Sequence, residues 1–105
     1  MATAAAPGTI LDQPSLSDRF RPSPNVVWAR HTDATVLLDV DRGLYYTLND
    51  AAGRIWELLV AGEPVIEILH CLTDEYAIDA DTLRSDVTRL IGDLLSRHLI
   101  EQYRQ

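Results

Sequence analysis

The sequence contains one cysteine, no lysine and no long hydrophobic run. The single cysteine, Cys71, cannot form an internal disulfide, and within an apolar helical pattern it is most often a small buried side chain. No stretch of 18 apolar residues is present to span a bilayer. The N-terminal residues lack both the positive segment and the apolar run of a signal peptide. We therefore expect a protein that contacts no membrane and works in the reducing cytoplasm.

Positive charge is scarce as well. Nine arginines stand against 16 acidic residues, and the formal net charge is −7. This charge repels a phosphate backbone unless the basic side chains gather on one face of the protein. In the C-terminal half the arginines are interleaved with acidic residues and form no basic stripe. The sequence therefore predicts no nucleic-acid partner.

Residues that carry catalytic or metal chemistry are few and scattered. Cys71 follows His70 directly, but adjacent residues on a helix point about 100° apart and are poorly placed to share a proton. No two Cys or His residues have metal-ligand spacing. Asp39 and Asp41 flank a tight turn that matches no calcium-loop consensus, and no Gly-rich phosphate loop is present. We predict no catalytic residue, no metal site and no cofactor.

The chain has room for one domain. It contains 105 residues, of which 47 % are hydrophobic, and this is enough for one packed core. Residues 1–24 contain four of the five prolines together with scattered Ser, Asp and Gly, a composition typical of disorder. We predict a flexible tail over residues 1–24, a domain over residues 25–101 and a C-terminal tail over residues 102–105.

Three short β-type runs open the predicted domain, at residues 26–29, 35–40 and 44–48. The segments between them are turn-like and too short for a parallel crossover. The strands should therefore form an antiparallel meander. Leu99 and Ile100, at the end of the domain, either return as a short final strand or seal the bottom of the core.

Helical patterns follow the strands. A first helix is predicted over residues 50–61 after the candidate cap Asn49, a second begins near Pro64, and a third covers residues 80–97 after Asp79. The third helix carries an apolar stripe wider than the thin sheet and two short helices require. This stripe is either all core or partly a surface for a guest. The sequence thus predicts an α+β fold.

The third predicted strand, Leu44-Tyr-Tyr-Thr-Leu48, contains neither a charge nor a proline. Proteins normally cover or charge an unpaired strand edge, because it is an aggregation hazard. If this strand lies at an edge of the sheet, a physiological partner would explain why the edge has been kept apolar.

Several segments occur in a characteristic order. They are Gly43-Leu-Tyr-Tyr-Thr-Leu-Asn49, Ala51-Ala-Gly-Arg-Ile-Trp56, Asp79-Ala-Asp-Thr-Leu83, Asp86-Val87, and Leu94-Leu95 followed by Leu99-Ile100. This ordered set, over about residues 25–101, resembles the PqqD-like family of RiPP recognition elements, modules that bind the leaders of ribosomally made, modified peptides. The resemblance implies a winged helix-turn-helix-like fold, with a three-stranded antiparallel sheet followed by three helices.

The resemblance also implies a function without catalysis. Such a module captures the leader segment of a precursor peptide and presents it to a separate leader peptidase or other modifying enzyme. Free-standing members with the Tyr46-Thr-Leu-Asn49 pattern resemble above all the discrete subunits of lasso-peptide biosynthesis. A peptide chaperone for a radical-SAM enzyme is the alternative within the family. A small winged-helix DNA-binding regulator is the alternative from another class.

The same resemblance implies a binding site. The leader adds to the edge of the third strand, antiparallel to it, and places alternate side chains in a groove against the third helix. The strand contributes Leu44, Tyr45, Tyr46, Thr47 and Leu48. The helix contributes Val87, Leu90, Ile91 and Leu94, with Asp86 or Arg89 at the rim.

Overall fold

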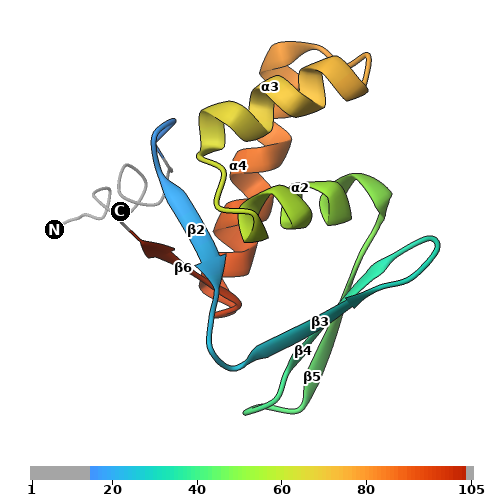
Figure 1. The fold of residues 1–105 in the computed structure, drawn as a ribbon, viewed down its shortest axis with the longest axis vertical. Helices are drawn as coiled ribbons and strands as arrows, with labels where there is room; N and C mark the ends of the chain where they lie inside the picture. The colour runs from blue at the N-terminus through green and yellow to red at the C-terminus, as the bar shows by residue number, and fades with distance from the viewer. Residues whose placement is uncertain (1–14, 104–105) are drawn as a thin grey trace, which may run out of the picture.

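The computed structural model describes residues 15–103 (Figure 1). Its elements are β2 (Arg19–Pro22), β3 (Val26–Arg30), β4 (Thr35–Asp39), β5 (Leu44–Leu48), α2 (Asp50–Val60), α3 (Val65–Glu75), α4 (Ala80–Ser96) and β6 (Ile100–Tyr103). Strands β3, β4 and β5 form an antiparallel sheet in that order, and β2 pairs antiparallel with β6 in a separate ribbon. The predicted α+β fold, with a three-stranded antiparallel sheet followed by three helices, is confirmed.

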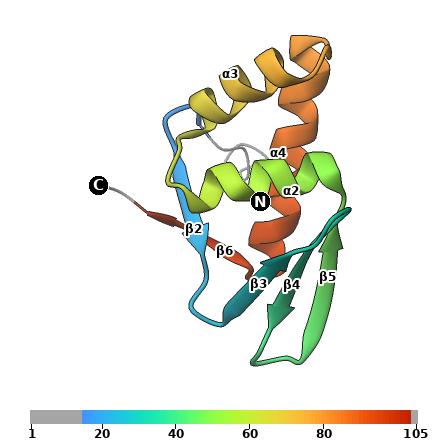
Figure 2. The same cartoon turned by 45° about the vertical axis from the view of Figure 1, so that its right-hand side comes forward.

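The three-stranded sheet has a buried face and an open face. On β4, Thr35, Leu37 and Asp39 point toward the core and are 2 %, 0 % and 0 % exposed. The helices lie on this side of the sheet (Figure 2). A Cβ atom at Gly53 of α2 would lie only 2.7 Å from the Thr35 Oγ1 atom, so the glycine allows α2 to approach β4 closely.

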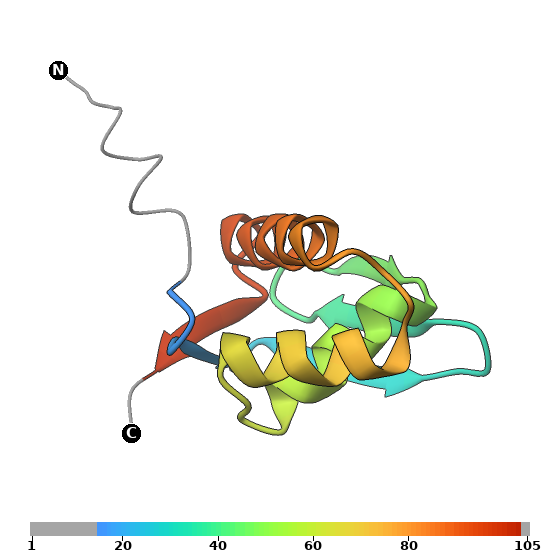
Figure 3. The same ribbon diagram turned by 90° about the horizontal axis from the view of Figure 1, so that it is seen from above.

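The core joins the sheet to all three helices. Its largest fully buried side chains include Trp56 of α2, Leu37 of β4, Ile68 and Leu72 of α3, and Val87 and Ile91 of α4. Helices α3 and α4 pack against each other and are joined at one end, as Figure 3 shows from above. Trp28 of β3 meets Trp56 edge-on, with 6.0 Å between the ring centroids. No described helix is long and apolar enough to cross a membrane.

The prediction of a flexible tail over residues 1–24 is wrong for Arg19–Pro22, which form β2. Phe20 at the centre of this strand is 1 % exposed and belongs to the core. Figure 1 shows β2 lying beside β6, and the register pairs Phe20 with Gln102. Because the partner strand lies about 80 residues away in sequence, no local pattern indicates the pairing.

The domain therefore extends beyond the predicted residues 25–101. Ile100 starts β6 and Leu99 is fully buried, so this segment both forms a final strand and closes the core. Residues 102 and 103 also belong to β6, which corrects the predicted C-terminal tail. The remaining parts of the predicted tails, residues 1–14 and 104–105, lie outside the described residues.

The segment before β2 also caps a helix. Pro64 precedes α3 and supplies no side-chain acceptor to the free N–H groups of the first turn. Instead the Val65 N–H donates to the Asp18 carbonyl at 3.0 Å, and the Ile66 N–H donates to the Leu16 carbonyl at 2.9 Å. The other two helices carry the predicted side-chain caps, Asn49 and Asp79. The start of α3 thus depends on the segment that we expected to be flexible.

Helices α2 and α4 end in the same type of turn, with different residues at its left-handed position. Gly62 takes this position after α2 with a φ of 86°, as is common for a glycine that ends a helix. His98 takes it after α4 with a φ of 59°. The His98 N–H donates to the Leu95 carbonyl and the Leu99 N–H to the Leu94 carbonyl, which is the Schellman pattern. A β-carbon is strained in this conformation.

We expect the substitution His98→Gly to stabilise the protein. Removing the β-carbon relieves the left-handed strain, and the gain in the free energy of unfolding should be about 0.5–1 kcal/mol. Thermal denaturation followed by circular dichroism measures the change. Ser96→Gly, inside the last turn of α4, should instead destabilise by a similar amount, and a loss of stability in His98→Gly would contradict the strain.

Asp39 is a buried carboxylate at the end of β4. Its Oδ1 atom accepts hydrogen bonds from the Asn25 side-chain amide at 3.0 Å and from the Asp41 and Arg42 N–H groups at 3.1 and 3.2 Å. The hydrogen bond from Asn25 is the main reason that the pKa of Asp39 lies below its ordinary value of 3.8. The carboxylate thus fixes the hairpin between β4 and β5.

This interaction makes stability depend on pH. Because the folded pKa of Asp39 is depressed, its contribution is fully present above the unfolded pKa and is lost as the pH falls through the folded pKa. Asn25→Ala should therefore lower the melting temperature clearly at about pH 7 and much less at about pH 3. Melting curves of both proteins across this range test the expectation, and a deficit independent of pH would contradict it.

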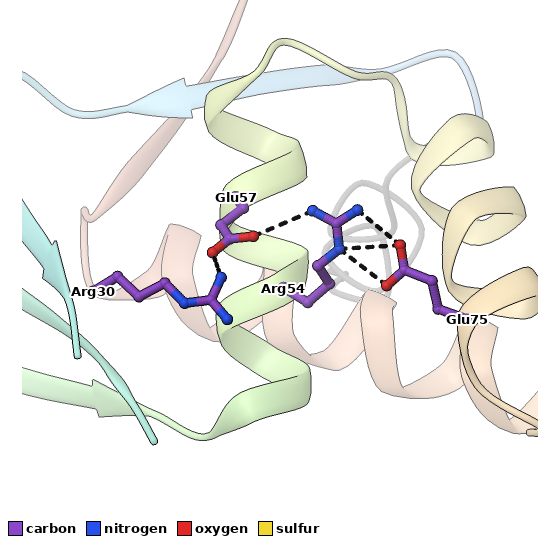
Figure 4. A network of polar contacts seen from close by, with 4 residues as sticks. All are labelled: Arg30, Arg54, Glu57 and Glu75. Carbon is purple, nitrogen blue, oxygen red and sulfur yellow. Dashed lines mark hydrogen bonds and ion pairs between the residues drawn. The ribbon is translucent and has the colours of Figure 1, made fainter. Parts of the chain in front are cut away.

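Four charged side chains connect β3, α2 and α3 (Figure 4). Arg54 pairs with Glu75 at 2.7 Å and with Glu57 at 3.2 Å, and Glu57 also contacts Arg30. Hydrogen bonding between Arg54 and Glu75 raises the pKa of Arg54 and lowers the pKa of Glu75. Since these side chains remain partly exposed, each pair contributes about 1 kcal/mol or less. The network orients α2 against its neighbours.

Candidate functional site

Strand β5 lies at an edge of the three-stranded sheet, because the strand order is β3-β4-β5. One hydrogen bond shows which way the backbone groups of β4 and β5 are directed: the Val40 N–H, just after β4, donates to the Asn25 carbonyl, just before β3. Successive residues of a strand turn their backbone N–H and C=O groups to opposite sides. The backbone groups of Asp39 and Leu37 therefore point toward β5. Their partners on β5 are Leu44 and Tyr46.

The intervening residues of β5 therefore point away from the sheet. Tyr45 and Thr47 turn their N–H and C=O groups outward, where no described strand pairs with them. The edge offers two donors and two acceptors in alternation over about 7 Å of strand. This arrangement suits the backbone of one additional extended strand.

The side chains of β5 divide between the two faces of the sheet. Tyr45 is 71 % exposed on the open face, and Thr47 is exposed on the same face. On the other face Tyr46 is half-buried, Leu48 is buried, and Leu44 at the hairpin end is exposed. The predicted strand residues thus all lie at the edge, but only Tyr45, Thr47 and Leu44 present open side chains.

Helix α4 approaches the inner face of β5. The Arg97 guanidinium, at the C-terminal end of α4, lies 5.3 Å from the centroid of the Tyr46 ring. This distance is typical of a cation–π contact. It fixes the spacing between the edge strand and the helix, and it places a positive charge at the rim of the edge.

An open groove of about 280 Å³ lies between α4 and the start of α2. Asp86, Arg89, Leu90 and Asp93 line it from α4, and Asn49, Ala51, Ala52 and Ile55 line it from the end of β5 and the start of α2. Three of the predicted helix residues, Asp86, Arg89 and Leu90, are thereby brought together. Because Asn49 follows Leu48 directly, the groove continues from the end of the edge strand.

The other predicted helix residues lie elsewhere. Val87, Ile91 and Leu94 are 0 %, 0 % and 3 % exposed and belong to the core. They cannot line an open groove, and this corrects the prediction for these three positions. The wide stripe on α4 is explained by its packing: one part faces α3 and β6, and only the part around Leu90 borders the groove.

Sequence reasoning missed Asp93, Arg97 and Asn49. Helical spacing could have found Asp93, because it lies four residues after Arg89 and so on the same face of α4. Asn49 was identified as a helix cap, and its side chain does accept from the Ala52 N–H at 2.9 Å. No local signal indicates the contact of Arg97 with Tyr46, which depends on how α4 packs.

Within residues 15–103 no group of three or more His, Cys, Asp and Glu side chains could hold a metal ion. Cys71 is half-buried and packs against the core. His70, beside it, is exposed and lies 3.6 Å from Glu67. The edge of β5 and its groove are thus the best-formed candidate site.

Comparisons with known proteins identify the family of the chain and two similar solved structures. The sequence model of the family described as "Coenzyme PQQ synthesis protein D (PqqD)" matches residues 34–100. A solved structure described as "TbiB1 in Complex with the TbiA(beta) Leader Peptide" is 33 % identical, with a TM-score of 0.75, and the match covers 81 % of this chain and 99 % of that one. No curated protein matches the chain.

A second solved structure is described as "Lasso peptide synthetase B1 complexed with the leader peptide". It is 29 % identical to this chain, with a TM-score of 0.74, and the match covers 79 % of this chain and 98 % of that one. The family match includes β5, all three described helices and the start of β6. The chain belongs to the PqqD family.

Proposed function

We propose that this chain is a non-catalytic cytoplasmic adaptor in lasso-peptide biosynthesis. It captures the leader segment of a ribosomal precursor peptide by strand addition to β5 and presents it to a separate leader peptidase or other modifying enzyme. The observation that carries the proposal is the unpaired edge of β5, with the backbone groups of Tyr45 and Thr47 directed outward. Strand addition to such an edge is a common mode of peptide recognition.

The two similar structures support the proposal. Both are described as complexes with a leader peptide, and one of them is described as a lasso peptide synthetase subunit. Each match covers nearly the whole of the other chain. A domain of this size with the same fold is therefore sufficient for the proposed role.

The geometry of the edge suggests how a leader would be read. An antiparallel guest would start near Asn49 and run toward Leu44, exchanging hydrogen bonds with Tyr45 and Thr47. Alternate guest side chains would face α4, near Tyr46 and Arg97. The backbone pairing would supply affinity for any extended peptide, and the groove beside Leu90 would select particular side chains.

A peptide chaperone for a radical-SAM enzyme is the alternative within the family, and it would use the same edge. The DNA-binding alternative, a small winged-helix regulator, is less well supported by the charges. The exposed face of α4 carries Asp81, Asp86 and Asp93 beside its arginines, and the net charge of the chain is −7. A helix that enters the major groove of DNA needs a basic face to neutralise phosphates.

Fluorescence anisotropy with a labelled candidate leader peptide tests the proposed function. We expect saturable binding that persists at moderate salt, because backbone hydrogen bonds carry much of it. A labelled DNA duplex serves as the comparison and should not bind at micromolar protein. Salt-sensitive binding of the duplex, together with no binding of any candidate leader, would reject the adaptor in favour of the regulator.

A further inference from the structure

Most arginines that the structure describes have a partner, but those of α4 do not. Four arginines outside α4 pair with carboxylates, and Arg19 donates to the Gly62 carbonyl at 2.7 Å. Arg84 and Arg89 within α4, and Arg97 at its C-terminal end, form no ion pair with any other described residue. Three positive charges therefore remain free to meet a guest, on a chain whose net charge is −7.

Two of these arginines lie on the side of α4 that borders the site. Arg89 lines the groove together with Asp86 and Asp93, at the spacings at which charged side chains on a helix interact. Arg97 has only Asp93 at such a spacing on the helix, and it lies beside the ring of Tyr46 on the edge strand. Arg97 thus carries the less compensated positive charge, and this charge lies next to β5.

The Tyr46 ring holds the Arg97 side chain in place and leaves its donors available. The guanidinium lies 5.3 Å from the ring centroid, and a cation–π contact of this kind uses none of the five N–H donors of an arginine. Tyr46 itself is half-buried and packs against the core. An arginine held in this way loses less side-chain entropy on binding, and its planar group can donate two parallel hydrogen bonds to one carboxylate.

Strand addition would place one guest residue directly opposite Tyr46. The Tyr46 backbone is directed toward Leu37 of β4, so on the guest side this position is a non-hydrogen-bonded pair, in which opposed side chains approach most closely. Opposed residues of antiparallel strands share a face of the sheet, so the guest side chain would point toward α4 and Arg97. The guest residue two positions earlier would lie opposite Leu48, where the groove begins.

We propose that Arg97 selects the leader by pairing with an acidic side chain, at the guest position opposite Tyr46 and two residues after the side chain that enters the groove. This inference rests on the proposed function. Backbone pairing accepts any extended peptide, whereas a charge pair at one position also fixes the register. A shift by one residue would turn the acidic side chain to the other face of the sheet, and a shift by two would move it about 7 Å along the strand.

A double-mutant cycle between the chain and its leader tests this pairing. The probes are the labelled leader region of the precursor from the same biosynthetic system and a set of variants, each with one Asp or Glu changed to Asn or Gln. Fluorescence anisotropy measures their affinity for the full-length parent and for Arg97→Gln. We expect Arg97→Gln to bind the unchanged leader about fivefold more weakly. With one amide variant the parent and Arg97→Gln should bind equally, because that variant lacks the paired carboxylate.

Arg84→Gln is the matched control. Arg84 is also exposed and forms no ion pair with another described residue. At about 100° per residue, however, it lies about 140° around the helix axis from Arg97. Its substitution should leave the affinity for the unchanged leader within about twofold of the parent. Circular dichroism melting curves check that both variants are folded.

The outcomes separate this inference from the proposed function. If the parent binds no leader, the proposed function fails and the pairing fails with it. If the parent binds and Arg97→Gln keeps full affinity, the charge pair alone is wrong. It is also wrong if Arg97→Gln weakens the unchanged leader and every amide variant by the same factor, because support of the Tyr46 ring would act on all of them equally. A leader that binds the parent but contains no acidic residue would overturn the pairing as well.

Discussion

Replacing Phe20 with alanine should lower the free energy of unfolding by about 3–5 kcal/mol. Phe20 is 1 % exposed, in a segment whose proline-rich composition predicts disorder. The substitution removes a large buried side chain and leaves a cavity between β2 and the helices. Because small domains have only about 5–15 kcal/mol of stability, the variant should be partly unfolded at physiological temperature.

Urea denaturation, followed by the fluorescence of Trp28 and Trp56, measures this loss. Arg21→Ala is the matched control, because Arg21 lies next to Phe20 on β2 but is 59 % exposed, where it pairs with Glu101. Its cost should be about 1 kcal/mol or less. Equal and small effects of the two substitutions would show that β2 contributes little to the free energy of unfolding. This result would support the predicted flexible tail over the ordered strand.

Proline at Tyr45 should weaken leader binding about tenfold or more while the domain stays folded. Proline removes the outward N–H, and its ring occupies space where the guest strand would lie. A guest carbonyl is then left without a donor, which costs about 1–3 kcal/mol. Folding should tolerate the change, because proline is found on edge strands when its nitrogen faces away from the sheet.

Tyr45→Ala separates the backbone from the side chain. It keeps the outward N–H and removes the ring from the open face of the sheet, so it should bind the leader much more tightly than Tyr45→Pro. Circular dichroism of both variants checks that the sheet is intact. Equal leader affinity of a folded Tyr45→Pro variant and the parent would contradict strand addition at β5.

Local patterns predict most of this fold. The caps Asn49 and Asp79 and the glycine at position 62 define helix ends within about one residue, because each acts on backbone groups a few positions away. The turns between the strands are short and fix an antiparallel meander. These features depend on nearest neighbours in sequence, and they are visible without a structure.

Long-range pairing is where sequence reasoning fails. The β2–β6 ribbon joins two segments about 80 residues apart, and each strand has only four residues. Strands this short carry too few side chains for a periodic pattern. The capping of α3 by the carbonyl groups of Leu16 and Asp18 also has no sequence signal, because any residue can supply a backbone acceptor.

The candidate site was predicted in outline but not in detail. The family resemblance implied the third strand as the binding edge, and all five predicted strand residues do lie on the edge strand β5. On α4 the apolar stripe cannot tell which side chains face the core, because Val87, Leu90 and Ile91 are all hydrophobic and close in sequence. Only the packing of α4 against α3 and β6 separates buried Val87 and Ile91 from Leu90 at the groove.

A chemical-shift titration of the isotope-labelled chain with a candidate leader peptide is the most direct test of strand addition at β5. We expect large amide shifts over residues 44–48 and beside the groove at Arg89, Leu90 and Arg97, and small shifts along β2, β6 and the free edge of β3. Saturation should follow a single binding curve. Shifts concentrated on β3, or a spectrum unchanged by a leader that the cognate enzymes process, would contradict recognition at the edge of β5.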